Sequence, residues 1–174
     1  MKATHRSAEE RYESYREKAR ISATEALPVE LKNQVRFDKI DFKALIQAKA
    51  WQLSPLRQLD WDWTGEYDLY SFTNPKRFEL TIWHRHELCA VSMGRPTWNG
   101  SRLRLDSIES APSNHPLRSK VLPLTVLALE EYAEQIGAHE IRIMEPVNEQ
   151  VRAYYVSMGF AYNPHGNYCW RNIT

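Results

Sequence analysis

The stretch that decides the fold is Asn148-Glu149-Gln150-Val151-Arg152-Ala153-Tyr154-Tyr155-Val156-Ser157-Met158-Gly159-Phe160. At about 100° per residue, a helix over this stretch carries four residues on one side: Asn148, Val151, Tyr155 and Gly159. An amide and a phenol therefore share one helix face. Gly159 is a natural end for the helix, and Phe160 can then pack back onto the core.

The rest of the chain divides into periodic segments. Apolar spacing predicts helices over residues 5–22, 39–51 and 122–136, and strands over residues 77–83, 88–93, 101–110, 140–144 and 166–173. Residues 54–66 are expected to form a loop. Asn99-Gly100 is the strongest turn dipeptide of the chain and predicts a hairpin, while Asp41 is a candidate helix cap and Gly137 a helix end.

Length and composition set bounds on the class of protein. A chain of 174 residues with a net charge of +1 is expected to form one domain, without a general attraction to nucleic acid or anionic membranes. No apolar run approaches the roughly 18 residues of a membrane span, so a cytoplasmic location is expected. Cys89 and Cys169 lie in apolar strand segments and are expected to be buried free thiols. His84 and His86 are interpreted as turn residues, and no metal site is predicted.

The 148–160 helix resembles that of the GNAT superfamily of acyl-CoA-dependent N-acyltransferases, which reads Asn-x-x-Ala-x-x-Leu-Tyr-x-x-x-Gly-Phe. Four residues match by type and spacing, namely Asn148, Tyr155, Gly159 and Phe160, while Val151 and Tyr154 replace the usual Ala and Leu. The resemblance covers about residues 78–162. It implies an α/β (α+β) fold with a mixed, mostly antiparallel central sheet flanked by helices and a V-shaped split between central strands. A single domain over 1–174, with a helical extension at about 1–25, is expected.

The same resemblance implies acetyl-CoA, or another acyl-CoA, as the cofactor. Leu105 to Pro112 looks like the family's central strand, whose free backbone groups at Ile108 and Ser110 would pair with pantetheine. The family's glycine-rich loop aligns with Arg118-Ser119-Lys120-Val121-Leu122-Pro123, where every glycine is absent. The predicted cofactor contacts are therefore Ile108, Ser110, Arg118 to Leu122, Asn148 and Tyr155, with a reshaped anion site.

Two functions follow from this departure. The favoured one is an N-acetyltransferase that transfers an acyl group from acetyl-CoA to an amine acceptor, because Asn148 and Tyr155 are both present. The alternative is a GNAT-like fold without normal acyl-CoA chemistry that acts as a protein-interaction module. Such a module would bind its partner through Tyr12 and Tyr15 of the first helix or through the Trp61–Trp63 loop.

Three residues are candidates for catalysis in the favoured reading. The resemblance makes Tyr155 the general acid that protonates the leaving thiolate; the alternative is a tyrosine that only caps the core. Glu109, with Asp106 behind it, is the candidate general base. Because they are three residues apart on an extended strand, they are expected to face opposite sides. Asn148 has a second interpretation as a helix N-cap.

The acceptor site is expected on the 54–66 loop. Trp61 and Trp63, with Asp60 and Asp62, predict an acidic aromatic wall suited to a cationic amine, of a small molecule or a peptide. The alternative is a loop that buries two indoles. Nucleic acid is disfavoured by the near-neutral charge, although Arg102, Arg104, Arg118 and Lys120 form a local basic group. The 5–22 helix is interpreted as a solvated surface helix. The alternative is that it docks on a partner subunit, as in a homodimer.

Overall fold

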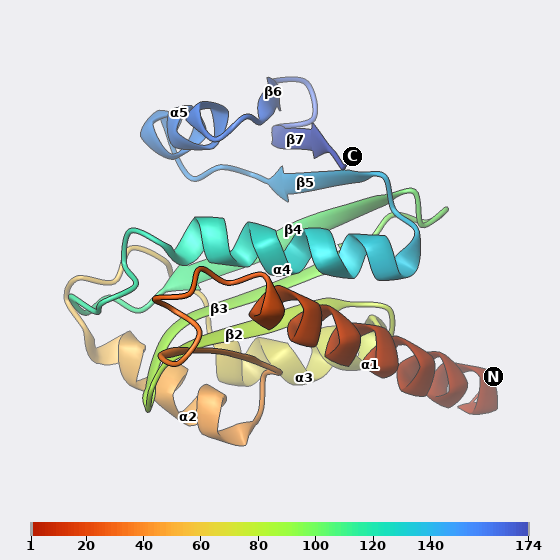
Figure 1. Cartoon of the computed structure of the whole chain (residues 1–174), viewed down its shortest axis with the longest axis horizontal. Helices are drawn as coiled ribbons and strands as arrows, with labels where there is room; N and C mark the ends of the chain where they lie inside the picture. Colours follow the sequence, from red (N-terminus) through yellow and green to blue (C-terminus); the bar gives the residue numbers. More distant parts are fainter. Residues whose placement is uncertain (1, 174) are drawn as a thin grey trace.

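The computed structural model describes residues 2–173. The helices are α1 (Lys2–Glu25), α2 (Phe42–Ala50), α3 (Trp63–Thr73), α4 (Val121–Ile136) and α5 (Glu149–Ser157), with a 3-10 turn at Trp51–Leu53. The strands are β1 (Val35–Asp38), β2 (Phe78–His84), β3 (Glu87–Pro96), β4 (Arg102–Ser110), β5 (Glu140–Met144), β6 (Ala161–Asn163) and β7 (Tyr168–Asn172). They form one sheet in the order β1-β2-β3-β4-β5-β7-β6 (Figure 1). Among the strand pairs of the described residues, β4–β5 is parallel and the others are antiparallel.

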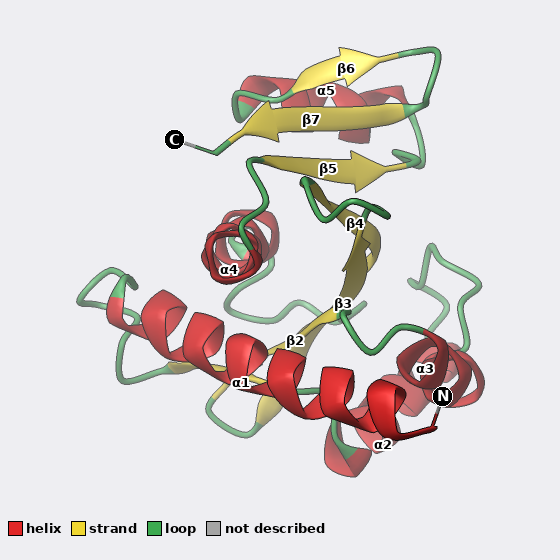
Figure 2. Cartoon of the chain, turned by 90° about the vertical axis from the view of Figure 1, so that its right-hand side faces the viewer, coloured by secondary structure: helices red, strands yellow, loops and turns green. Residues whose placement is uncertain are grey.

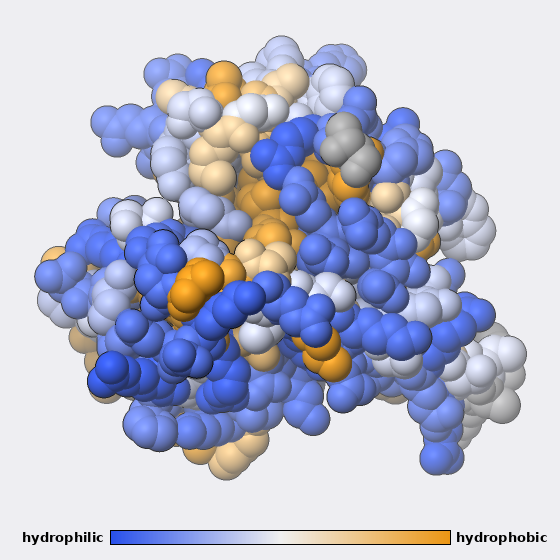
Figure 3. All heavy atoms as spheres, in the orientation of Figure 1, coloured by the Kyte–Doolittle hydropathy of each residue, from blue (hydrophilic) through white to orange (hydrophobic). Residues whose placement is uncertain are grey.

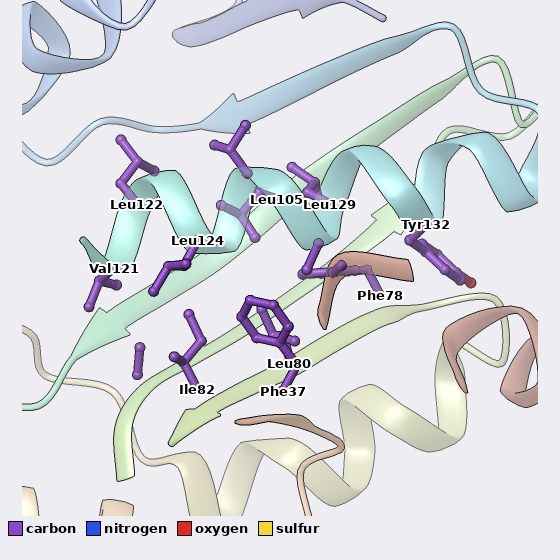
Figure 4. Close-up of a cluster of buried hydrophobic side chains, with 14 of the residues drawn as sticks. Phe37, Phe78, Leu80, Ile82, Leu105, Val121, Leu122, Leu124, Leu129 and Tyr132 are labelled. Atoms are coloured by element: carbon purple, nitrogen blue, oxygen red, sulfur yellow. The ribbon is translucent and has the colours of Figure 1, made fainter. Parts of the chain in front are cut away.

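Helices cover both faces of this sheet. α4 and α3 lie on opposite sides of β3 and β4, and α1 lies on the same side as α4 (Figure 2). The larger core fills the α4 side, where Phe78, Leu80 and Ile82 of β2 meet α4 (Figure 4). The alternate residue Trp83 belongs to a second core under α2 and α3. Successive side chains of β2 point to opposite faces of the sheet, and both faces are covered, so β2 is buried on both sides.

Most predicted elements are present. Asp41 caps α2 by accepting a hydrogen bond from the N–H of Ala44 at 2.9 Å, and Gly137 ends α4 with a left-handed φ of 75°. The turn at Gly100 closes the β3–β4 hairpin through a 2.8 Å bond to the Thr97 carbonyl. Both cysteines are buried and free. Within residues 2–173, none of the helices is long and apolar enough to cross a membrane.

Three elements were not predicted, namely β1, β6 and most of α3. The predicted 54–66 loop is wrong at its end, because α3 begins at Trp63. Asp62 caps this helix by accepting a hydrogen bond from the N–H of Thr64. Aromatic and polar residues with low helix propensity, together with Gly65, hide the helical pattern of this segment.

The predicted V-shaped split lies between β4 and β5. Their pairing runs only from Arg102–Glu140 to Leu105–Ile143. β4 continues to Ser110, and among the described residues this part has no strand partner on the β5 side. Figure 1 shows the two strands diverging there. The fold is therefore the mixed, mostly antiparallel sheet with a split that the sequence predicts.

A β-bulge lies where the split opens. Met93 of β3 pairs with Ser107 and Gly94 pairs with Leu105, which leaves Asp106 as an extra residue on β4. Gly94 lies so close to β4 that a Cβ atom there would be 2.0 Å from the Arg104 carbonyl oxygen. The bulge therefore requires glycine at this position.

Candidate active site

A cavity of about 630 Å³ occupies the split. It is lined from both faces of the sheet. The α4 side contributes Ile108, Ser110, Arg118, Asn148, Val151 and Tyr155, and the α3 side contributes Arg57, Trp61, Trp63, Asp106 and Glu109. In the space-filling view a hollow with apolar residues separates the part of the molecule that carries α5 from the part below it (Figure 3). The split is thus a passage through the sheet.

Tyr155 lies in the wall of this passage. Its side chain is 8% exposed and packs into the larger core beside Phe160 and Cys169. Burial raises the pKa of the Tyr155 phenol to about 12. Within residues 2–173, its hydroxyl has no hydrogen-bond partner. A protonated phenol with a free donor therefore lines the cavity.

Asn148 begins the helix that carries Tyr155. Its side-chain oxygen accepts a hydrogen bond from the N–H of Val151 at 2.9 Å, so it is the N-cap of α5. The carboxamide nitrogen is not used by this cap and still has two donors. Asn148 is exposed and lies in the cavity wall, so one side chain can cap the helix and bind a ligand.

The start of α4 offers backbone donors without any glycine. Lys120 and Arg118 use their N–H groups in turns, bonding the carbonyls of Leu117 and His115. The N–H groups of Ser119, Val121 and Leu122 have no partner within residues 2–173. Pro123 is the third residue of α4, where a missing N–H leaves no helical bond broken. Three free donors at a helix N-terminus, with the Arg118 and Lys120 side chains exposed beside them, suit an anion.

His115 fixes the loop before α4 and was missed by the sequence reasoning. It is buried, its Nδ1 accepts a hydrogen bond from the N–H of Leu117 at 3.2 Å, and its Nε2 lies 2.8 Å from Ser110 Oγ. Because Nδ1 is the acceptor, the neutral ring carries its proton on Nε2 and donates it to Ser110. Burial lowers the pKa of His115. A buried, neutral imidazole thus holds the loop to the end of β4.

Glu109 is fully engaged on the α3 side. Arg57 forms two hydrogen bonds with its carboxylate, at 2.8 and 3.0 Å, and Trp63 Nε1 donates a third at 2.8 Å. The Glu109 and Arg57 side chains are both buried, and Arg57 also donates to the carbonyl of Trp61. This network ties the 54–62 loop and α3 to β4. Both oxygens of Glu109 already accept hydrogen bonds in this network.

Asp106 faces the same side as Glu109. Tyr70 of α3 donates a hydrogen bond to Asp106 at 2.8 Å. Trp63 lies seven residues earlier, on the same face of α3, and donates to Glu109. The prediction that the two carboxylates face opposite sides is therefore wrong. The extra residue of the bulge at Asp106 shifts the alternation of β4 by one position. Asp106 also pairs with Arg104 at 3.1 Å and Arg95 at 3.4 Å.

The predicted acceptor wall is only partly present. Trp61 and Trp63 line the cavity with their rings edge to face, 6.1 Å between centroids. Asp62 does not line it, because its carboxylate caps α3 and accepts from Thr64 and Gln52. The 54–62 loop contributes a cation, Arg57, to the cavity lining. The wall is therefore aromatic without being acidic.

The chain resembles known proteins in structure but not in sequence. No protein-family model matches the sequence, and no curated protein sequence matches it significantly. The ribosomal-protein-S18-alanine N-acetyltransferase from Escherichia coli is similar in structure, with a TM-score of 0.55, 13% identity, and coverage of 80% of this chain and 94% of that one. A spermidine N-acetyltransferase from Vibrio cholerae has a TM-score of 0.59 and 11% identity, over 80% of this chain and 94% of that one.

A third similar structure is Naa50 of Arabidopsis thaliana, in complex with a bisubstrate analogue that contains CoA. Its TM-score is 0.50 at 18% identity, over 79% of this chain and 95% of that chain. At such identities the likeness concerns the fold. The chain has the fold of the GNAT acetyltransferases, as its sequence predicts.

Proposed function

We propose that this protein is an N-acyltransferase that transfers the acetyl group of acetyl-CoA to an amine acceptor. The observation that carries the proposal is the unpartnered, protonated hydroxyl of Tyr155 in a cavity that passes through the split between β4 and β5. Because Tyr155 lines this cavity, a ligand bound there can accept the hydrogen bond that its hydroxyl offers.

The residues on the α4 side fit the cofactor. The free N–H groups of Ser119, Val121 and Leu122 and the side chain of Arg118 suit its diphosphate. Unpaired backbone groups of β4 at Ile108 and Ser110 suit the amides of its pantetheine, and the Asn148 carboxamide lies on the opposite wall. Bound acetyl-CoA would supply an activated thioester carbonyl.

Transfer requires a proton donor and a proton acceptor. The amine nitrogen forms a bond to the carbonyl carbon, the carbon–sulfur bond breaks, and Tyr155 donates its proton to the leaving thiolate. The amine gives up a proton to a base. We assign this role to Asp106, directly or through water. Both carboxylates have partners, but the Asp106 side chain is 16% exposed, whereas that of Glu109 is 5% exposed. Glu109 instead positions the Trp61–Trp63 loop.

Acetyl-CoA binding is the first test. A ligand that binds only the folded state raises the midpoint of thermal unfolding, and a millimolar cofactor with micromolar affinity stabilises by about 4 kcal/mol. Acetyl-CoA and CoA should raise the midpoint, and the Arg118→Gln variant should reduce the shift. The Arg85→Gln variant, at an exposed turn between β2 and β3, is the matched control. No shift in the wild type would refute the proposal.

The interaction-module alternative has less support. Ala19 and Ala23 of α1 are buried in the larger core, and Tyr12 and Tyr15 pack against it. Trp63 is buried and bound to Glu109. The aromatic residues that would have to meet a partner are thus already used by the fold.

A further inference from the structure

Four residues form a row across one face of the sheet. Arg95 of β3 is directly opposite Arg104 of β4, Arg104 is opposite Arg142 of β5, and Arg142 is opposite Trp170 of β7. Directly paired residues of neighbouring strands point to the same face. With strands about 4.8 Å apart, the row is roughly 14 Å long. We refer to Arg95, Arg104, Arg142 and Trp170 as the arginine row.

The arginine row lies on an open face. α4 and α5, which pack against β5 and β7, do so from the other side, through the core that contains Ile143 and Cys169. The side chains of Arg95, Arg104 and Arg142 are 44%, 31% and 19% exposed. Part of each of these three side chains is therefore accessible to solvent.

The row keeps a positive charge after internal pairing. Asp106 pairs with Arg95 and Arg104, and Glu140 pairs with Arg142 and with the neighbouring Arg102. Four guanidinium groups thus share two carboxylates. The buried Nε of Arg104 has no hydrogen-bond partner within residues 2–173. Such a face attracts anions, and arginine binds carboxylates in a bidentate manner.

The row ends beside the cavity. Arg104 precedes Asp106 by two residues on β4, and Arg142 precedes Met144 by two residues on β5; Asp106 and Met144 both line the cavity. The cofactor groups lie on the α4 side of the split, whereas the row lies on the α3 side, where Asp106 meets Tyr70. An acceptor that enters from the α3 side thus passes over the row.

Resting on the proposed function, we infer that the acceptor is an acidic peptide whose amine enters the split while its carboxylates bind the arginine row. Side chains on one side of an extended peptide are about 7 Å apart. Two acidic residues with one residue between them therefore fit within the length of the row. Asp106 and Glu140 neutralise part of the charge of these arginines, so the remaining charge suits one or two carboxylates better than a continuous chain of phosphates. Nucleic acid, which Tyr168 and Trp170 could stack against, is the competing occupant.

The test uses acetyl-CoA and three lysine-free decapeptides that differ only at their second to fourth residues, which are acidic, amide or arginine. CoA release gives kcat/KM for each peptide. The acidic peptide should have a kcat/KM about tenfold above that of the amide peptide, and the arginine peptide should be the poorest. Arg104→Gln and Arg142→Gln should each reduce this preference by about threefold.

Matched variants separate charge from folding. Arg142→Lys should retain most of the preference, and Arg85→Gln, away from the row, should retain all of it. Anisotropy of a labelled acidic decapeptide, which needs no turnover, should show binding that weakens with salt. Equal kcat/KM for the three peptides, or an unchanged preference in the Gln variants, would overturn the inference.

Three further outcomes separate this inference from the proposed function. Tighter binding of a single-stranded RNA decamer than of the acidic peptide would overturn the choice of a peptide. If acetyl-CoA stabilises the protein but no peptide is acetylated, the acceptor class is wrong and the proposed function stands. If acetyl-CoA does not bind, the proposed function fails, and this inference fails with it.

Discussion

The two sides of the split differ in how far their polar groups are satisfied. On the α4 side, the Tyr155 hydroxyl and the first N–H groups of α4 have no partner within residues 2–173. On the α3 side, both oxygens of Glu109 accept hydrogen bonds from Arg57 and Trp63 and its side chain is only 5% exposed. Asp106 pairs with Tyr70, Arg95 and Arg104 but keeps 16% of its side chain exposed. Groups that are left unpaired are available to a ligand, whereas saturated groups hold the protein together. Residue type alone made Glu109 the leading base, and its contacts make it a structural anchor.

The largest expected effect is on the α4 side. Tyr155→Phe removes one hydroxyl and should lower kcat by about 10² to 10³, because general acid catalysis contributes effects of that size. The stabilisation by CoA should stay as in the wild type, since the ring still packs in the core. Steady-state kinetics and thermal unfolding measure the two effects. A variant with full activity would remove Tyr155 from the mechanism.

The next effect is on the stability of the α3 side. Glu109→Gln leaves the buried guanidinium of Arg57 without its counter-ion and should cost roughly 3 kcal/mol of unfolding free energy. Denaturation in urea gives this value, and Glu17→Gln on the exposed face of α1 is the matched control. A cost no greater than that of the control would show that Glu109 is not an anchor.

The bulge should be sensitive to one added methyl group. Gly94→Ala places a Cβ atom against the Arg104 carbonyl, so β3 and β4 must move apart. We expect a loss of about 1–3 kcal/mol in unfolding free energy. If the bulge also directs Asp106 toward α3, the same variant should lower kcat; unchanged stability would show that the strands tolerate the shift.

A smaller effect concerns pH and His115. Burial lowers its pKa below the ordinary 6.5, so the folded state favours the neutral ring. The resulting stability is present above pH 6.5 and is lost as the pH falls through the folded-state pKa. Unfolding at pH 7.5 and pH 5 should show this loss in the wild type and a smaller one in His115→Gln. Parallel pH profiles would contradict the role of His115.

The smallest expected change is in the alkaline limb of the rate profile. Burial raises the pKa of Tyr155 to about 12, so the phenol stays protonated and able to donate at pH 10. The kcat should therefore not fall between pH 8 and pH 10 through loss of this proton. A descending limb with a midpoint near pH 9, absent in Tyr155→Phe, would show that the hydroxyl is more solvated than the structure indicates.

The fold was largely predictable from local patterns, and the site only in part. The α4 stripe and the Asn148–Phe160 helix depend on residues close in sequence, so periodicity identifies them. The facing of Asp106 and Glu109 depends on a bulge that is set by Gly94 on another strand, which no pattern in β4 reveals. The Arg57–Glu109 pair joins residues 52 positions apart. The free N–H groups at the start of α4 result from backbone geometry. Because this segment has no glycine, the sequence gives no sign of them.

The outer strands of the sheet have a consequence for self-association. β1 has four residues and β6 has three, so each border of the sheet exposes few backbone groups to a neighbouring molecule. Short borders of this kind hinder edge-to-edge growth into aggregates. If two copies of this chain associate, we therefore expect them to meet through side chains on the faces of the molecule.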